Sequence, residues 1–401
     1  MTRHLTKVAA TLLLISTTLD PLFGQSSEGL RVQLDEIAKA QVEARDRFTK
    51  DLEGKVTEQE QQPPIDRFHA AVAKHTNLIL DLIQANPTDP AVVDACNFVI
   101  KTARAGPGEQ SYRALEVLLR DHSRDPGMGE LCRGIFFYVH SPVAEALLRS
   151  VMANHPNRVD RGWACHTLAT FLKLQAKMVR RVRKVPAEVN RYVHEHHKEA
   201  TERLIREADP TALEREAEAL LERIIAEYAD IKGRDETRNL GMIAAGELFA
   251  MRNLSIGKVA PEIQGKDHEG KTFSLSDYRG KVTVLTFSGN WCGPCVGMYP
   301  QERELIARSE GKPFVLLSVN SDSEVETLKS SIDSGKVTWR CWWDGGMEGP
   351  ITSRWGISSF PSIFVLDKAG IIRFRDVRGD ELDQAVALLL AEASAEKDFS
   401  N

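Results

Sequence analysis

The six residues NWCGPC at positions 290–295 decide the fold expected for the second half of this sequence. An apolar run, VTVLTFS at 282–288, precedes them and is typical of a buried β-strand, and a helical pattern follows. Cys292 and Cys295 are therefore expected at the start of a helix, one turn apart and on the same side of it. This spacing allows the two sulfurs to form a disulfide.

The start of a helix favours a reactive cysteine. Unpaired backbone N–H groups there stabilise a thiolate, so the pKa of Cys292 is expected below the free value of about 8.5. Cys292 then attacks a disulfide, a mixed disulfide forms, and the more buried Cys295 releases the product. Gly293 allows close approach of a substrate chain, and Pro294 is tolerated in the first helical turn.

Two other interpretations of the cysteine pair are a zinc half-site and an inert buried pair. No second pair lies at zinc-finger spacing, so the sequence predicts no metal site here.

The segments around this motif predict an α/β domain with a mixed sheet. A second buried strand is expected at 314–319, a hairpin at 362–374, and a final helix at 381–392. The resulting order, β-α-β-α-β-β-α, places helices on the faces of a central sheet. Cys341 lies in a further expected strand, 339–343, as a packed core thiol or, alternatively, a secondary redox partner.

From about 254 to 390 the sequence resembles the TlpA/ResA-like branch of thioredoxin-fold proteins, which includes redoxin (AhpC/TSA) domains. The resemblance is carried by IGKVAP at 256–261, by the segment 270–281, by WCGPC at 291–295 and by SFPS at 359–362. It implies a thioredoxin-like domain over 253–401. It also implies a thiol-disulfide oxidoreductase that reduces protein disulfides, with no cofactor besides a redox-active Cys292–Cys295 disulfide.

The resemblance also assigns roles to residues around the cysteines. Pro361 should follow a cis peptide bond and face the two cysteines, so that the backbone of Phe360 is presented to a docked substrate strand. Trp291 should cover the site, and Gly293 and Pro294 complete the expected substrate-binding set.

Two positions depart from the family pattern. Thr286 stands where thioredoxin has a buried aspartate, and Met298 stands where ResA-like proteins often have a glutamate. We therefore expect slow deprotonation of Cys295, or a water in the role of the base.

The region 25–252 predicts an all-α domain of helical-hairpin repeats. Similar apolar patterns recur at 78–87, 146–156 and 220–228, and stacked hairpins of this kind usually form a scaffold or a docking surface. Cys96, Cys132 and Cys165 are expected to be core residues, with a structural disulfide among them as the alternative.

Three histidines, His194, His196 and His197, lie in a charged segment of this region. They indicate a solvated face more than a metal site, because no ligand set completes them; a docking patch for an acidic partner is a further interpretation.

The N-terminus is typical of an export signal over residues 1–24. Arg3 and Lys7 precede an uncharged apolar stretch at 8–19, which is shorter than the roughly 20 residues that span a bilayer. The sequence thus predicts export to the bacterial periplasm or cell envelope, with membrane anchoring if the segment is not cleaved.

The composition of the chain limits the class of protein and the kinds of partner. The chain has 401 residues, 42% of them hydrophobic and 27% charged, with 52 basic and 57 acidic side chains and a net charge of -5. These values are typical of a globular protein of two or three domains and argue against a nucleic-acid partner. The expected partners are a disulfide-containing protein, a thiol electron donor and proteins docked on the helical repeats.

Two other functions remain open at this point. One is a redox-linked helical adaptor. The other is a thiol peroxidase, although the segment FSGNW at 287–291 lacks the proline that peroxidatic sites place before their cysteine.

Overall fold

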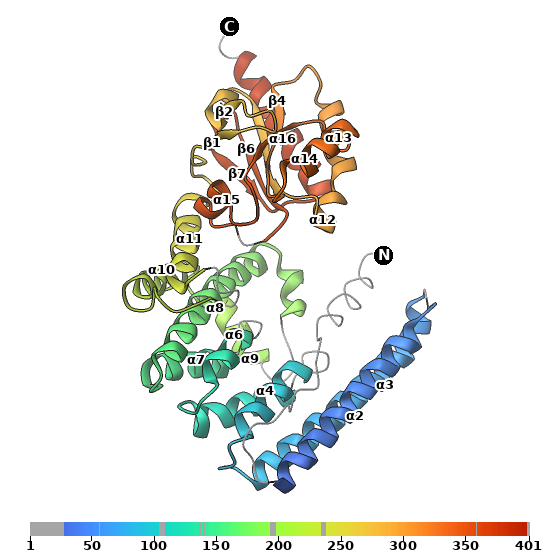
Figure 1. Cartoon of the computed structure of the whole chain (residues 1–401), viewed down its shortest axis with the longest axis vertical. Coiled ribbons are helices and arrows are strands. Elements are labelled where there is room, and N and C mark those ends of the chain that lie inside the picture. Colours follow the sequence, from blue (N-terminus) through green and yellow to red (C-terminus); the bar gives the residue numbers. More distant parts are fainter. Residues whose placement is uncertain are drawn as a thin grey trace. The chain divides into compact units, whose positions relative to one another are not determined.

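Figure 1 shows the computed structural model of the chain, which describes residues 28–55, 57–103, 109–135, 138, 141–192, 198–233, 238–357 and 359–398. The chain divides into two compact units between Ile231 and Lys232. The expected signal segment at 1–24 and the histidines at 194, 196 and 197 lie outside the described residues.

The described part of the N-terminal unit is helical. Its α-helices are α2 (Glu28–Leu52), α3 (Glu58–Ala85), α4 (Val92–Ala103), α5 (Glu109–Val117), α6 (Met128–Ile135), α7 (Pro142–Asn154), α8 (Arg158–Lys184), α9 (Lys198–Glu207) and α10 (Pro210–Glu227), with a π-helical turn η1 (Leu118–His122) and a 3-10 turn η3 (Pro186–Arg191). None of the described helices of the chain is both long and apolar enough to cross a membrane.

Local sequence signals start these helices. Thr57 accepts a hydrogen bond from the backbone of Glu60, whose side chain bonds back to Thr57, and Asp209 caps α10 before Pro210. Neighbouring helices such as α2 and α3, or α8 and α10, pack against each other. The all-α prediction is confirmed, while the equivalence of successive hairpins as repeats stays a prediction.

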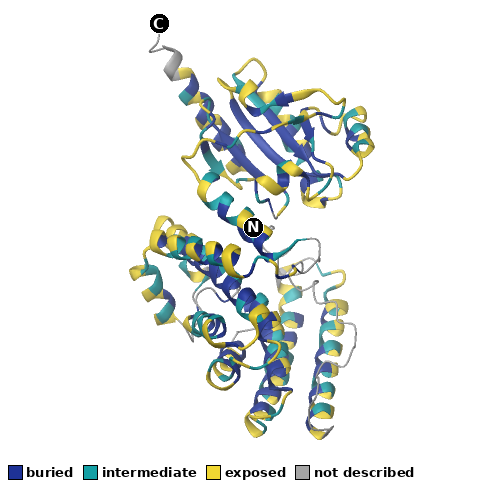
Figure 2. Cartoon of the chain, turned by 60° about the vertical axis from the view of Figure 1, so that its left-hand side comes forward, coloured by how far each residue is buried: buried dark blue, intermediate teal, exposed yellow. Residues whose placement is uncertain are grey.

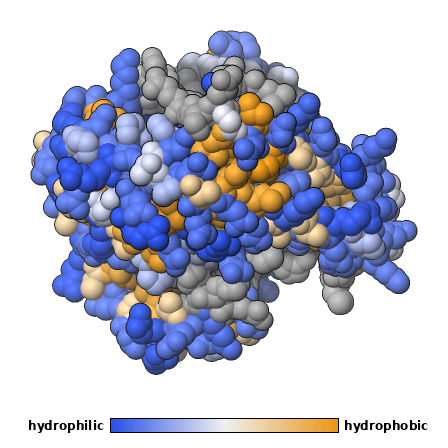
Figure 3. All heavy atoms as spheres, turned by 90° about the horizontal axis from the view of Figure 1, so that it is seen from below, coloured by the Kyte–Doolittle hydropathy of each residue, from blue (hydrophilic) through white to orange (hydrophobic). Residues whose placement is uncertain are grey.

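Polar and apolar side chains are unevenly distributed over the surface. On the face shown in Figure 3 hydrophilic side chains dominate and hydrophobic ones gather in a smaller area. Buried positions of α8, among them Phe171, Leu172 and Val179, are fully enclosed, as expected for a helix that packs against α6, α7 and α10.

The C-terminal unit is an α/β domain. Its elements are α11 (Leu240–Asn253), β1 (Gln264–Lys266), β2 (Thr272–Ser274), a 3-10 turn η5 (Leu275–Tyr278), β3 (Val282–Ser288), α12 (Gly293–Val296), α13 (Tyr299–Arg308), β4 (Phe314–Asn320), α14 (Val325–Asp333), β5 (Arg340–Trp343), α15 (Pro350–Arg354), β6 (Ser362–Leu366), β7 (Ile372–Arg375) and α16 (Asp380–Asp398). The predicted strands, hairpin and final helix are confirmed, and β1 and β2 form an additional antiparallel hairpin.

Five strands form one mixed sheet in the order β5-β4-β3-β6-β7. β3 is central and pairs in parallel with β4 and antiparallel with β6. All seven residues of β3 are buried, because both faces of the sheet are covered. The strands stand out as buried in Figure 2. This thioredoxin-like arrangement confirms the predicted fold class.

Alternation along β3 and β4 separates two apolar clusters. Val284 and Leu316 point into a cluster that also contains Tyr299 of α13, Leu328 of α14 and Leu382 of α16. Their strand neighbours point into a second cluster on the opposite face, which contains Phe287, Leu317, Trp342, Trp355 and Phe364.

The boundary between the units lies earlier than the change of sequence pattern predicts. The pattern places it at 252/253, whereas α11 belongs to the C-terminal unit. Phe249 and Ala250 pack against the second cluster, and Gly246 lies so close to Gly356 that a Cβ on Gly356 would come 2.2 Å from the Gly246 carbonyl oxygen. A helical pattern shows that α11 forms, but only its packing shows which core it joins.

Candidate active site

The two cysteines of the motif are joined by a disulfide at the end of β3. Cys292 is the N-cap residue of α12, and its sulfur accepts a hydrogen bond from the backbone N–H of Cys295 at 3.2 Å. Cys292 is 5% exposed and Cys295 1%, which agrees with the predicted order of burial. Helix α12 has only one turn, so its dipole is small. A thiolate at Cys292 would therefore be stabilised mainly by nearby backbone N–H groups.

Trp291 and the Phe360–Pro361 pair meet beside this disulfide. The Phe360–Pro361 peptide bond is cis, which confirms the prediction for that bond. The rings of Trp291 and Phe360 lie edge to face, with centroids 5.0 Å apart. Trp291 is 49% exposed, and Gly293 and Pro294 are also exposed. The exposed Trp291, Gly293 and Pro294 and the half-buried Phe360 thus form an uncharged surface next to Cys292, suited to an uncharged peptide segment. Pro361 itself is buried, and its carbonyl accepts a hydrogen bond from Arg378 at 2.6 Å.

Hydroxyl groups occupy the place of the missing aspartate. The hydroxyl of Thr286 donates to Ser318 Oγ at 3.0 Å, and Ser318 Oγ lies 2.9 Å from Ser288 Oγ. Ser288 in turn lies next to the Tyr299 side chain. The row lies on the face of the sheet that α13 covers, and all four residues are buried. The hydrogen bonds along this row pair the buried hydroxyl groups with one another but supply no charge.

A buried carboxyl group lies on the same side of the sheet and was not expected from the sequence. Glu302, one helical turn after Met298, is 3% exposed, and burial raises its pKa to about 8. The sequence signal is its spacing: Glu302 lies three residues after Tyr299 and three before Leu305, both buried on α13. In the folded protein Glu302 is therefore largely protonated at neutral pH.

A second feature that sequence reasoning missed is a polar network behind the motif. The buried carboxylate of Asp322 accepts hydrogen bonds from the backbone N–H and the side chain of Asn290. The available signal was the segment Asn320-Ser321-Asp322 at the carboxyl end of β4, because this end lies beside the corresponding end of the parallel strand β3.

The other four cysteines are free and buried. This confirms core packing for Cys96, Cys132, Cys165 and Cys341, and they form no disulfide with one another. Burial raises the pKa of Cys96 and of Cys165 to about 12 and raises those of Cys132 and Cys341 as well.

We therefore expect iodoacetamide to distinguish Cys292 from these four thiols. After mild reduction of the folded chain at pH 8, Cys292 should be alkylated first, and the four core cysteines only after denaturant is added, because a buried protonated thiol is a poor nucleophile. Peptide mass mapping of the modified chain measures this order. Alkylation of Cys341 as rapid as that of Cys292 in the folded chain would contradict the assignment.

The described residues contain no group of three or more His, Cys, Asp or Glu side chains able to hold a metal ion.

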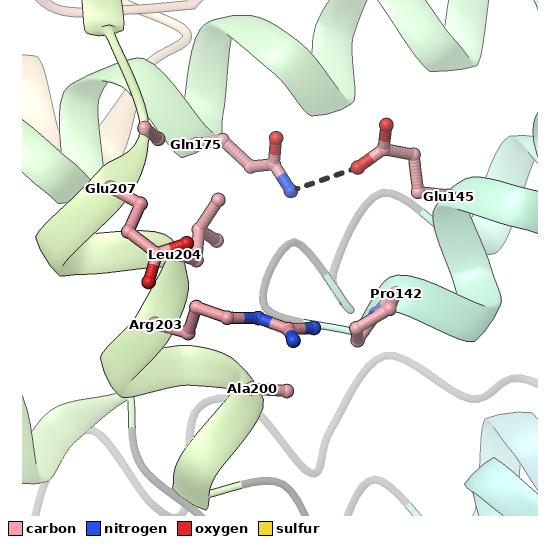
Figure 4. A pocket seen from close by; sticks show the side chains of 8 residues that line it. Pro142, Glu145, Gln175, Ala200, Arg203, Leu204 and Glu207 are labelled. Atoms are coloured by element: carbon pink, nitrogen blue, oxygen red, sulfur yellow. Dashed lines mark hydrogen bonds between the residues drawn. The ribbon is translucent and has the colours of Figure 1, made fainter.

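A cavity of ≈ 300 Å³ lies in the N-terminal unit between α7, α8 and α9. Figure 4 shows Arg203 and Glu207 on one side and Gln175 donating to Glu145 at 3.4 Å on another. No cysteine lines this cavity, so it supplies no redox chemistry.

Comparison with known proteins agrees with the geometry of the C-terminal unit. Residues 256–375 match the AhpC/TSA family. These residues form an AhpC/TSA-family domain of the thiol-disulfide oxidoreductase class. Thiol-disulfide oxidoreductase ResA of Bacillus thuringiensis subsp. konkukian is 29% identical over 128 residues, which are 32% of this chain and 72% of that protein. ResA of Bacillus anthracis is 30% identical over 117 residues, 29% of this chain and 66% of that protein.

A solved structure gives a similar match for this AhpC/TSA-family domain. The thioredoxin domain of a thiol-disulfide oxidoreductase from Bacteroides vulgatus is 28% identical and covers 34% of this chain and 99% of its own, with a TM-score of 0.32. Each of these matches covers about a third of the chain.

Proposed function

We propose that this protein is an exported thiol-disulfide oxidoreductase that reduces disulfides of other proteins through Cys292 and Cys295. The observation that carries the proposal is the Cys292–Cys295 disulfide at the start of α12, beside the uncharged surface of Trp291 and Phe360. No cofactor besides this disulfide is required.

The reaction moves two electrons to the substrate. In the reduced protein the Cys292 thiolate attacks a substrate disulfide; a mixed disulfide forms, and one substrate sulfur leaves as a thiolate that takes up a proton. Cys295 then loses its proton and attacks the sulfur of Cys292. The second substrate sulfur leaves, and the Cys292–Cys295 disulfide forms. An external dithiol reduces this disulfide and restores the starting state.

The surface around the site supports an extended protein segment as the substrate. Trp291, Gly293 and Pro294 are exposed and uncharged, and the half-buried Phe360 lies beside Trp291. In this proposal an added strand runs along the Phe360 backbone, because the Pro361 carbonyl is already bonded to Arg378. Cys292 itself is only 5% exposed, so a substrate disulfide has to settle onto this surface before it reacts.

The N-terminal sequence supports an extracytoplasmic location. A basic start followed by an apolar stretch at 8–19 is typical of secretion, and the periplasm or cell envelope is where substrate disulfides persist.

The helical N-terminal unit favours a second candidate function that is compatible with the first. Its described helices cover much of residues 28–231 and carry no redox-active pair, so they are free to dock a partner protein. In this adaptor function the redox domain would mainly hold or sense the docked partner.

Trapping of mixed disulfides distinguishes the reductase function from the adaptor function. In Cys295→Ser the mixed disulfide on Cys292 cannot be resolved, so the variant expressed in bacteria should retain substrate proteins that dithiothreitol releases. Mass spectrometry of the released proteins identifies them, and exported, cysteine-containing proteins are expected.

The double variant Cys292→Ser/Cys295→Ser is the matched control and should release none of these proteins. Equal recovery from both variants would mean that the partners are held by non-covalent docking, as an adaptor requires.

A further inference from the structure

The residues that follow β4 hold the loop between β3 and α12. The Asp322 carboxylate, 3% exposed, accepts hydrogen bonds from the Asn290 backbone N–H at 2.7 Å, from Asn290 Nδ2 at 2.7 Å and from Asn320 Nδ2 at 2.9 Å. Both oxygens of the carboxylate are used. Asn290 is thereby fixed two residues before Cys292.

Helix α14 holds the oxygen of the Asn290 side-chain amide. Ser331 of α14 donates its hydroxyl to Asn290 Oδ1 at 2.8 Å, so the Asn290 side chain can adopt only one orientation between α14 and Asp322. The next residue is held as well, because the indole N–H of Trp291 donates to the Ser321 carbonyl at 3.1 Å.

The chemistry of Asp322 suggests more than loop packing. No lysine, arginine or histidine forms an ion pair with it in the part of the chain that the structure describes, and its carboxylate is bonded to one backbone N–H and two side-chain amides. Burying an unpaired carboxylate is costly unless hydrogen bonds compensate for it. A neutral asparagine would fill the same volume, but its NH₂ group would face an N–H donor of Asn290 or Asn320 in place of an acceptor.

The residues held by these hydrogen bonds are adjacent in the chain to the reactive cysteine. Asn290 and Trp291 immediately precede Cys292, and the Trp291 ring contacts Phe360 of the cis-proline loop. A shift at Asn290 therefore changes the position of Cys292 relative to the surface on which the substrate lies. A displacement of about 1 Å between reacting groups can cost on the order of 100-fold in rate.

We propose that Asp322 is a positioning residue of the dithiol site, which acts through Asn290 to hold Trp291 and Cys292 in register with the Phe360–Pro361 loop. This inference rests on the proposed disulfide reductase function. Asp322 touches neither substrate nor sulfur in this assignment, and its effect passes through the hydrogen bonds of one asparagine.

The reciprocal exchange of the two side chains provides the test. Asp322→Asn in the full-length chain should lower kcat/KM for a synthetic disulfide-linked peptide by about 10-fold to 100-fold. Adding Asn290→Asp returns a carboxylate to the pair in the opposite position and should recover part of the lost kcat/KM, because the bond between the two side chains is restored while Asn320 Nδ2 loses its acceptor. The Trp291 emission, obtained by subtracting the spectrum of Trp291→Phe, should shift in the single variant and recover in the double variant.

Asp344→Asn is the matched control for loss of a buried carboxylate. Asp344 is 5% exposed and accepts backbone hydrogen bonds from Ile351 and Thr352, so it holds α15 rather than the dithiol loop. We expect this variant to lose stability but to keep its kcat/KM. If Asp322→Asn does not fold, Ser331→Ala removes one bond to Asn290 and should still lower kcat/KM several-fold.

The proposal is overturned if folded Asp322→Asn retains the kcat/KM of Asp344→Asn, if Ser331→Ala retains wild-type activity and Trp291 emission, or if the exchanged pair folds without recovery. Failure of the reductase function is a different result, because the wild-type chain itself would then be as inactive as Cys292→Ser.

Discussion

Cys292→Ser should abolish the reduction of protein disulfides by this chain. The serine hydroxyl keeps the size of the thiol and its place at the N-cap of α12, but at neutral pH it is neither ionised nor able to attack a disulfide. We expect the rate of insulin disulfide reduction with dithiothreitol as donor to fall by at least about 1000-fold, to the uncatalysed background. Turbidity of the released insulin chains measures this rate.

Cys341→Ala is the control within the same domain. Its thiol is buried in the cluster beneath α13, and burial raises its pKa, so its removal should leave the rate within about twofold of wild type. A large loss in Cys341→Ala would indicate a second redox cysteine. A Cys292→Ser protein as active as wild type would remove the catalytic assignment altogether.

Glu302→Gln should stabilise the protein at alkaline pH and have little effect in acid. Glu302 has a pKa of about 8 in the folded state, against 4.5 for a solvent-exposed glutamate. Between these values the folded state binds the extra proton, so stability falls as the pH rises through this window. The loss reaches roughly 5 kcal/mol above pH 8, because each unit of pKa difference corresponds to about 1.4 kcal/mol.

Glutamine resembles the protonated side chain and does not ionise, so Glu302→Gln avoids this loss. Urea unfolding between pH 5 and pH 9 measures the difference, with tryptophan emission as the probe, since every tryptophan except Trp163 lies in the C-terminal unit. Glu304→Gln, at an exposed position on the same helix, is the control and should not change the slope with pH. Parallel stability curves for wild type and Glu302→Gln would contradict the burial of an ionisable group at this position.

Local sequence patterns predicted much of the redox domain. The apolar runs at 282–288 and 314–319 became β3 and β4, and the cysteine pair lies at the strand-to-helix junction where the pattern placed it. The cis bond before Pro361 followed from the family resemblance. These features were accessible because strand periodicity, turn residues and a short motif are all encoded by residues that are near one another in the chain.

The positions of α11, Glu302 and Asp322 were not predictable in the same way. The helical pattern of α11 fits either unit, and only its contact with Gly356 and the second apolar cluster assigns it to the C-terminal one. Glu302 lies in the charged sequence QERE, which is typical of an exposed helix.

The sequence by itself therefore determined the reactive pair, the strands that carry it and the helical character of the first half. The tertiary structure alone decided which carboxyl groups are buried, as Glu302 is against the sheet, and which ones reach the dithiol loop, as Asp322 does through Asn290. The physical reason is that helix and strand periodicity depend on residues within a few positions, whereas desolvation and hydrogen bonding of a side chain depend on elements that folding brings together from distant parts of the chain.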